Sequence, residues 1–428
     1  MKKLLILSGA AVHIHLVQTA KEMGLYTIVT DYLKPERAPA KLVADEYWMI
    51  SITDTDRIVE RCEKENVSAV INACIDPAQK PYAEICSRLN LPCYGSQHQF
   101  DILTNKRRFR KCCTKLGISI VKEYTYTECS NIDANFPVLV KPLDSRASRG
   151  QTICSNHNEL SVAIDKAKSY SSSEDCIIEQ YLGYLPEISF TAFILNGIPY
   201  FVRTADKFLG NCSGELQRPI KCVSSPSKYT NKIIKIAEKY ITLLVKELGI
   251  KNGPIFLQGF WDGKDILLFD PAFRFHGSEY SKTLETATGI NLMKYLIELS
   301  LGKNPAFHKE KLLSSYKLNG KRHAMFILYL TAGRVASIRG FSLLKKNKCI
   351  IDLRQKVFEG DTVTSSSGDY IDNRAADVST LINDNFDSMN DISKTIYETI
   401  KMTDKTGNNM LIDQLSDEEI REYFAIGG

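Results

Sequence analysis

The chain has few of the features that mark specialised protein classes. None of its 12 cysteines stands in a Cys-x-x-Cys pair, and no apolar run approaches the 18 or so residues of a membrane helix. His13 and His15 form a His-x-His with no nearby acid or cysteine to complete a metal site. We therefore expect no membrane association, no zinc or disulfide framework, and reduced, mostly buried thiols in a cytoplasmic protein.

The charge balance is also unremarkable. Lys plus Arg total 55 against 50 Asp plus Glu, and this net charge of +5 is too small over 428 residues to favour nucleic acid as a partner. At roughly 100–200 residues per domain, the length predicts about two to four domains. The dense basic run at 106–111 suits either a phosphate-binding patch or, by default, a solvated helix face.

The first hundred residues alternate short apolar runs with helical patterns. The runs at 4–7, 26–30, 47–50 and 67–73 predict strands, and the segments near 12–23, 54–66 and 78–89 predict helices. This pattern is typical of a doubly wound α/β layer, and it favours a buried first strand over a signal peptide. Ser8-Gly9 and Asp31 lie where a dinucleotide-binding protein has its fingerprint, but with one glycine of three a nicotinamide enzyme is a minor alternative.

The middle of the chain has a different texture. A strand ends at Lys141-Pro142 and leads into a small, basic loop, and further strands are expected near 175–182, 187–196 and 198–205. After a long helix near 227–249, a hairpin over 254–271 places Gln258 and Asp270 across one ladder. Beyond a helix near 290–301 and a break at 302–305, we expect a strand-rich region with a hairpin around 331–334 and a solvated acidic helix near 417–419.

Four features of this middle region suit phosphate chemistry. The ammonium of Lys141 emerges at the edge of a buried sheet, and the loop 144–150 has small residues whose N–H groups can fold over phosphate oxygens. Glu179 and Glu187 lie across a short connector, and the segment 270–278 combines an acid, an arginine and a histidine that can hold a metal-bound phosphate and a second anion. A polar turn, solvated glutamates and a structural ion pair are the alternatives.

Taken in order over about 105–280, these elements resemble the ATP-grasp superfamily. The layout is similar to that of carboxyaminoimidazole ribonucleotide synthetases, biotin carboxylase and L-amino acid ligases. The resemblance implies an α/β and α+β protein with a Rossmann-like domain over 1–104 and an ATP-grasp domain of two α+β subdomains over 105–305. A small strand-rich α+β domain would follow over 306–428.

The resemblance also implies ATP and Mg²⁺, or Mn²⁺, as cofactors and assigns residues to them. Metal binding falls to Gln258 and Asp270, and catalysis to Arg274 with Lys141. Nucleotide binding falls to Lys106, Lys141, Ser145, Ser148, Arg149, Gly150, Glu179, Gln180, Tyr181, Leu182 and Glu187. Substrate contacts are assigned to Arg203, Lys207, Arg218, His276 and Ser278.

Three positions depart from the family pattern. Gln258 replaces the usual Glu with a neutral amide, Ala272 replaces an Asn, and Ala147 replaces a glycine of the lid. The function implied is an ADP-forming ligase that activates a small carboxylate as an acyl phosphate and joins it to an amine. A bicarbonate-activating carboxylase and a non-catalytic nucleotide-binding protein are the alternatives, and a homodimer follows by analogy alone.

Overall fold

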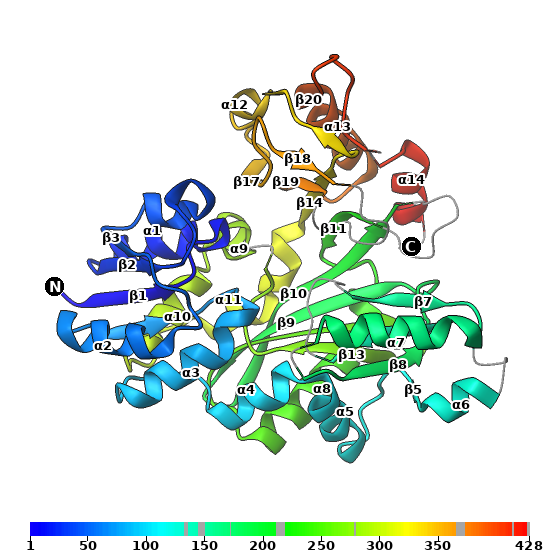
Figure 1. Ribbon diagram of the computed structural model, residues 1–428. Coiled ribbons are helices and arrows are strands. Elements are labelled where there is room, and N and C mark those ends of the chain that lie inside the picture. The colour runs from blue at the N-terminus through cyan, green and yellow to red at the C-terminus, as the bar shows by residue number, and fades with distance from the viewer. Residues whose placement is uncertain are drawn as a thin grey trace.

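The computed structural model describes residues 1–131, 136–143, 150–171, 173–210, 219–277, 280–364, 373–412 and 415–425. The N-terminal layer is a parallel sheet in the order β3-β2-β1-β4, shown in blue in Figure 1. Its strands β1 to β4 span Lys3–Leu7, Tyr26–Thr30, Glu46–Trp48 and Ala69–Ile71, and its helices α1 to α3 span Ile14–Glu22, Thr55–Glu65 and Gln79–Arg88. Because β1, β2 and β4 are almost wholly buried, the predicted α/β layer is confirmed.

The turn after β1 is held by Asp31, the residue that directly follows β2. One Asp31 carboxylate oxygen accepts hydrogen bonds from the Gly9 backbone N–H at 2.8 Å and from the Ser8 hydroxyl at 3.1 Å. A Cβ on Gly9 would lie 2.6 Å from the Ala38 Cβ, so the turn is also tightly packed. Asp31 therefore fastens the turn instead of offering its carboxylate to a ribose, and the dehydrogenase alternative loses its support.

A large sheet forms the centre of the molecule. It has eight strands in the order β13-β12-β9-β10-β11-β14-β19-β17 (Figure 1). The central strands β9 to β13 span Glu187–Leu195, Ile198–Leu209, Ile220–Ser225, Gly253–Trp261 and Ile266–Ala272. The helix α8 (Thr230–Leu248) buries residues at spacings of three and four and ends at Gly249, whose φ of +61° suits a glycine C-cap. The predicted long helix and the predicted hairpin are both confirmed.

A smaller antiparallel sheet, β5-β8-β6-β7, carries Lys141 and Glu179. The strands β5 to β8 span Glu123–Tyr124, Val138–Pro142, Thr152–Cys154 and Cys176–Gln180. With α7 (Leu160–Ser169) this sheet encloses a core of its own. The helices that connect it to the N-terminal layer are α4 (Gln97–Thr104) and α5 (Lys106–Lys115), and α6 (Tyr126–Asn131) follows β5.

The C-terminal strands join the large sheet across the predicted boundary near 305. These strands are β14 (Lys321–Tyr329), β17 (Ile350–Gln355) and β19 (Arg374–Asn383), and Figure 1 shows the C-terminal elements gathered beyond β14 in orange and red. A separate apolar core lies beneath them. The remaining elements are α9 (Ser281–Thr288), α10 (Leu292–Ser300), α11 (Lys309–Ser314), β15 (Gly333–Arg334), β16 (Ser337–Arg339), α12 (Phe341–Leu344), β18 (Thr362–Val363), α13 (Phe386–Thr399), β20 (Lys401–Thr403) and α14 (Asp417–Ala425).

Two sequence-based predictions need correction in this region. The hairpin expected around 331–334 is wrong, because β15 pairs with β18 rather than with β14. The chain turns away after β14, where the Thr331 N–H donates to the Met410 carbonyl at 2.8 Å. The acidic helix α14 is not wholly solvated either. Its Tyr423 is buried and donates to the buried Asp206 carboxylate at 2.7 Å.

The cysteines confirm their predicted role within the described ranges. Eleven of them are free, and seven of these eleven are buried. Burial raises the pKa of thiols such as Cys62, to about 12, which makes them unreactive core residues. None of the helices in the described ranges combines the length and apolar character that a membrane span requires.

Candidate functional site

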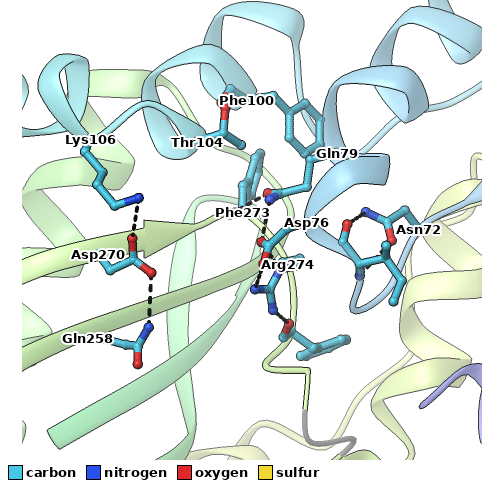
Figure 2. Close-up of polar contacts among 12 residues, drawn as sticks. Asn72, Asp76, Gln79, Phe100, Thr104, Lys106, Gln258, Asp270, Phe273 and Arg274 are labelled. Atoms are coloured by element: carbon cyan, nitrogen blue, oxygen red, sulfur yellow. Dashed lines mark hydrogen bonds and ion pairs between the residues drawn. The ribbon is translucent and has the colours of Figure 1, made fainter. Parts of the chain in front are cut away.

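A chain of polar contacts crosses one face of the large sheet. The Lys106 ammonium lies 3.7 Å from one Asp270 carboxylate oxygen, and the Gln258 amide N–H donates to the other at 3.1 Å (Figure 2). The Gln258 carbonyl oxygen in turn accepts from the Lys207 ammonium at 3.1 Å, and Lys207 also pairs with Glu187. Gln258 and Asp270 are paired in register, as the predicted hairpin requires. The structure thus joins five of the predicted site residues.

A buried ion cluster lies on the smaller sheet. The Lys141 ammonium donates to one Glu179 carboxylate oxygen at 2.6 Å, and the Arg110 guanidinium pairs with the other. All three side chains are at least 96% buried. Burial lowers the pKa of Lys141, Glu179 opposes that shift, and the nearby cations Arg110 and Lys106 add to it. A second carboxylate, that of Glu123, lies 3.9 Å from the Arg110 guanidinium, so Lys141 depends on Glu179 while Arg110 has two acidic neighbours.

This ion cluster reaches the large sheet. The Lys141 ammonium lies 5.4 Å from the centre of the Phe269 ring on β13, next to Asp270. The Lys106 ammonium lies 3.7 Å from that same Asp270. Both predicted phosphate lysines therefore lie beside residues 269–270 of β13, at the junction of the two sheets.

Arg110 is a site residue that the sequence analysis missed. The basic run 106–111 lies on α5, and the default interpretation of a solvated face fails for Lys106 and Arg110, which lie one helical turn apart on the inner side. Arg110 also donates to the Val121 carbonyl at 2.6 Å. The buried Phe109 and Cys113 in the same helix provide the signal that marks its inward face.

Arg274 is held by the N-terminal layer. Its guanidinium pairs with both carboxylate oxygens of Asp76 and donates to its neighbour's carbonyl, that of Phe275, at 2.5 Å. Gln79 donates to the same Asp76 at 3.1 Å (Figure 2). These bonds use three of the five N–H donors of the guanidinium, and the predicted contact between Arg274 and a substrate stays a prediction.

The predicted adenine-binding segment 179–182 follows β8 directly. The Glu179 carboxylate is taken up by the ion cluster, and Leu182 is buried. The backbone N–H groups of Gln180 and Tyr181 donate to the carbonyls of Lys122 and Pro137 at 2.9 and 3.3 Å. These bonds fix the segment to the sheet. Contacts between the segment and an adenine base stay a prediction.

Several predicted residues lie near the edge of the described structure or beyond it. Gly150 has a φ of +72°, and a Cβ there would lie 2.7 Å from the Tyr170 Cβ, so backbone strain and packing both require glycine. The centres of the His276 and Phe256 rings lie 4.7 Å apart. Burial, and next the positive charge of Arg203, lower the pKa of His276 well below its usual value. Outside the described residues lie Ser145, Ala147, Ser148, Arg149, Arg218 and Ser278.

The few oxygen donors near Gln258 suit a metal ion that takes most of its coordination from a bound phosphate and from water. Asp270 supplies one carboxylate and Gln258 one amide oxygen, while Ala272 is buried and supplies no donor. Within the described ranges, no group of three or more acidic, His or Cys side chains is placed to hold a metal ion. Mg²⁺ commonly takes one or two protein oxygens and completes its shell with phosphate oxygens and water, so Asp270 fits Mg²⁺ carried by a phosphate. Gln258 turns its amide nitrogen toward Asp270 and its oxygen toward Lys207, so its oxygen reaches the same metal only after the amide rotates.

The fold that places these residues is the ATP-grasp fold. Its solved representatives include the phosphoribosylglycinamide synthetase of Anaerococcus prevotii, with a TM-score of 0.71 at 18% identity, covering 94% of this chain and 100% of that one. The L-amino acid ligase of Bacillus licheniformis has a TM-score of 0.75 at 16% identity, covering 95% and 99%. The biotin carboxylase domain of the Hydrogenobacter thermophilus 2-oxoglutarate carboxylase, solved with MgADP and bicarbonate, has a TM-score of 0.75 at 16% identity, covering 100% and 95%.

Curated proteins of known description are similar to part of this chain. The formate-dependent phosphoribosylglycinamide formyltransferase of Wolinella succinogenes is 23% identical over 269 residues, covering 58% of this chain and 63% of that protein. The protein of the same description from Sulfurisphaera tokodaii is 26% identical over 264 residues, covering 58% and 64%. The chain thus spans less than two thirds of these two relatives. No family model matches it. The predicted resemblance to ATP-grasp ligases is confirmed at the level of the fold.

Proposed function

We propose that this protein is an ATP-dependent ligase that activates a small carboxylate as an acyl phosphate and joins it to an amine. The observation that carries the proposal is the meeting of two lysines with an acid and amide pair. Lys106 lies 3.7 Å from Asp270, which Gln258 also contacts, and Lys141 lies against the ring of the preceding Phe269. Cations beside a set of oxygen donors are the groups that bind a metal-bound triphosphate.

The reaction places most of its demands on positioning and charge. A carboxylate oxygen of the substrate attacks the γ-phosphorus of ATP and ADP leaves; the amine nitrogen then attacks the acyl carbon and phosphate leaves. Lys106 and Lys141 neutralise phosphate oxygens, and Asp270 with Gln258 would hold Mg²⁺, which would neutralise further phosphate charge. Arg274, held in place by Asp76, stabilises the charge that develops on the transferred group with its remaining N–H donors.

The test is a pairwise screen of acids and amines with Mg²⁺ and ATP that detects released ADP. We expect ADP release to require both an acid and an amine. Lys141→Ala should lower kcat/KM by about a hundredfold or more, because it removes a buried cation from the phosphates. Lys115→Ala is the matched control, since that lysine is exposed and pairs with Glu247. Full activity in Lys141→Ala would contradict the site.

A carboxylase that activates bicarbonate is the second enzymatic candidate. It is favoured by the likeness to the Hydrogenobacter thermophilus domain, whose structure contains MgADP and bicarbonate. ADP release that depends on bicarbonate, with no amine or other acid present, would select this alternative. That structure is described as a dimer of the domain, and a homodimer stays a prediction for the present chain.

A non-catalytic nucleotide-binding protein is the third candidate. It is favoured by Gln258, whose oxygen already accepts from Lys207 and whose amide adds no charge for a metal. Calorimetry that shows ATP binding without turnover of any acid, unchanged in Gln258→Glu, would select this candidate over the ligase.

A further inference from the structure

A narrow pocket beside the candidate site is lined by hydrogen-bond donors that lack acceptors. Arg203 is 99% buried, and its Nε donates to the Ser225 hydroxyl at 3.1 Å. Neither of its two terminal nitrogens has a partner among the described residues. The hydroxyls of Thr191, Tyr280 and Ser281 line the same pocket, and they are also buried and without partners in the described part of the chain. Unsatisfied buried groups are rare, so four in one pocket need an explanation.

The part of the pocket lining that the structure describes holds no carboxylate. It comprises Thr191, Val202, Arg203, Phe275, His276, Tyr280, Ser281 and Leu292. The Arg203 guanidinium lies 5.1 Å from the centre of the Tyr280 ring, which only partly offsets the loss of water. Burial lowers the pKa of Arg203 to about 10, so it remains a cation at neutral pH. A buried cation without a counter-charge is costly, and an anionic ligand would remove that cost.

The register of the sheet places this pocket next to the candidate phosphate site. Thr191 pairs with both Arg203 and Phe256, and one step along the same face Ser189 pairs with Gln258. Arg203, Thr191 and Phe256 thus form one row across neighbouring strands, and Ser189, Gln258 and Asp270 form another. Residues two apart on a strand point to the same face, so these two rows lie about 7 Å apart on one face of the sheet. One small molecule can therefore contact both rows.

The size of the pocket decides between kinds of anion. The space between its lining atoms is about that of one water molecule, which is too small for a phosphate and admits one oxygen of a carboxylate. That oxygen can accept hydrogen bonds from the terminal nitrogens of Arg203.

We propose that this pocket, the Arg203 pocket, binds a second, non-reacting carboxylate of the acid substrate, so that the substrate class is a dicarboxylic acid. The inference rests on the proposed function for the reacting end of the substrate. Arg203 and Thr191 hold one carboxylate, and the other reaches the row of Gln258 and Asp270, where phosphate is transferred.

Calorimetric titration of the full chain with a homologous series from succinate to adipate tests this inference, with and without a non-hydrolysable ATP analogue. Butyrate and hexanoate serve as matched monocarboxylates. We expect the preferred dicarboxylate to bind about tenfold more tightly than its monocarboxylate partner. Arg203→Met should abolish that preference, and Thr191→Val, which removes one hydroxyl while keeping the shape, should weaken it.

The controls separate this inference from the proposed function. Arg108→Met, at an exposed arginine on α5, should leave the preference unchanged. A preference for dicarboxylates that depends on Arg203 supports the pocket even if no acid causes ADP release, a result that would count against the ligase alone. Equal binding of the two series by the wild type, or a preference that survives in both Arg203→Met and Thr191→Val, overturns the inference. Tighter Arg203-dependent binding of chloride or inorganic phosphate also overturns it, because the pocket would then hold an inorganic ion.

Discussion

The substitution Glu179→Gln tests the buried ion cluster most directly. Glu179 is 2% exposed and is the carboxylate that Lys141 and Arg110 share. Glutamine keeps the size of the side chain and an oxygen that accepts from one of the two cations. It removes the negative charge, so Lys141 loses its counter-charge and Arg110 keeps only Glu123, at 3.9 Å.

The expected magnitude follows from this burial. Removing one partner of a buried ion pair typically costs about 3–5 kcal/mol, because the remaining charge stays desolvated. We expect Glu179→Gln to lower the free energy of unfolding by about that amount. The control is Glu247→Gln, which breaks an ion pair with the exposed Lys115 and should cost less than about 1 kcal/mol.

Urea unfolding followed by circular dichroism, for the wild type and the two variants, measures this difference. Saturating ATP should reduce the deficit of Glu179→Gln, because phosphate oxygens bring negative charge to Lys141. A deficit no larger than that of Glu247→Gln would refute the reasoning. It would mean that the cluster is solvated or neutral rather than a desolvated set of charges.

Three further predictions address other parts of the site. Gln258→Glu should tighten Mg²⁺ binding in the presence of an ATP analogue by about tenfold, measured by calorimetry, because it adds a charge beside Asp270; unchanged affinity would place the metal elsewhere. His323 is fully buried and its pKa lies well below the usual value because of burial and nearby arginines, so below pH 6.5 or so only the unfolded chain takes up its proton. The free energy of unfolding should then fall by about 1.4 kcal/mol for each unit by which the pH is lowered. Urea unfolding at several pH values should show that the free energy of unfolding depends less steeply on pH in His323→Leu. Tyr423→Phe removes the hydrogen bond to the buried Asp206 carboxylate and should cost about 1.5–3 kcal/mol; unchanged hydrogen exchange in α14 would show that this bond does not hold the helix.

Local patterns in the sequence determined the order and type of most elements. The apolar runs of the first hundred residues predicted the parallel layer, and the hairpin over 254–271 predicted the pairing of Gln258 with Asp270. Such features depend on neighbours within about twenty residues, where turn residues and hydrophobic periodicity fix the geometry. The failure around 331–334 shows the limit, since β15 has its partner about thirty residues further along the chain.

The tertiary structure alone decided what the charged side chains contact. Glu179 meets Lys141 and Arg110 across 38 and 69 residues of sequence, and Arg274 meets Asp76 across 198. Arg203, which the family resemblance placed in a general substrate region, proved to be buried without a carboxylate partner in the described structure. The sequence shows that charges are present, but their partners and their burial depend on how distant segments pack. The strength of a charge interaction depends on that burial, so the chemistry of the site became visible only in the folded chain.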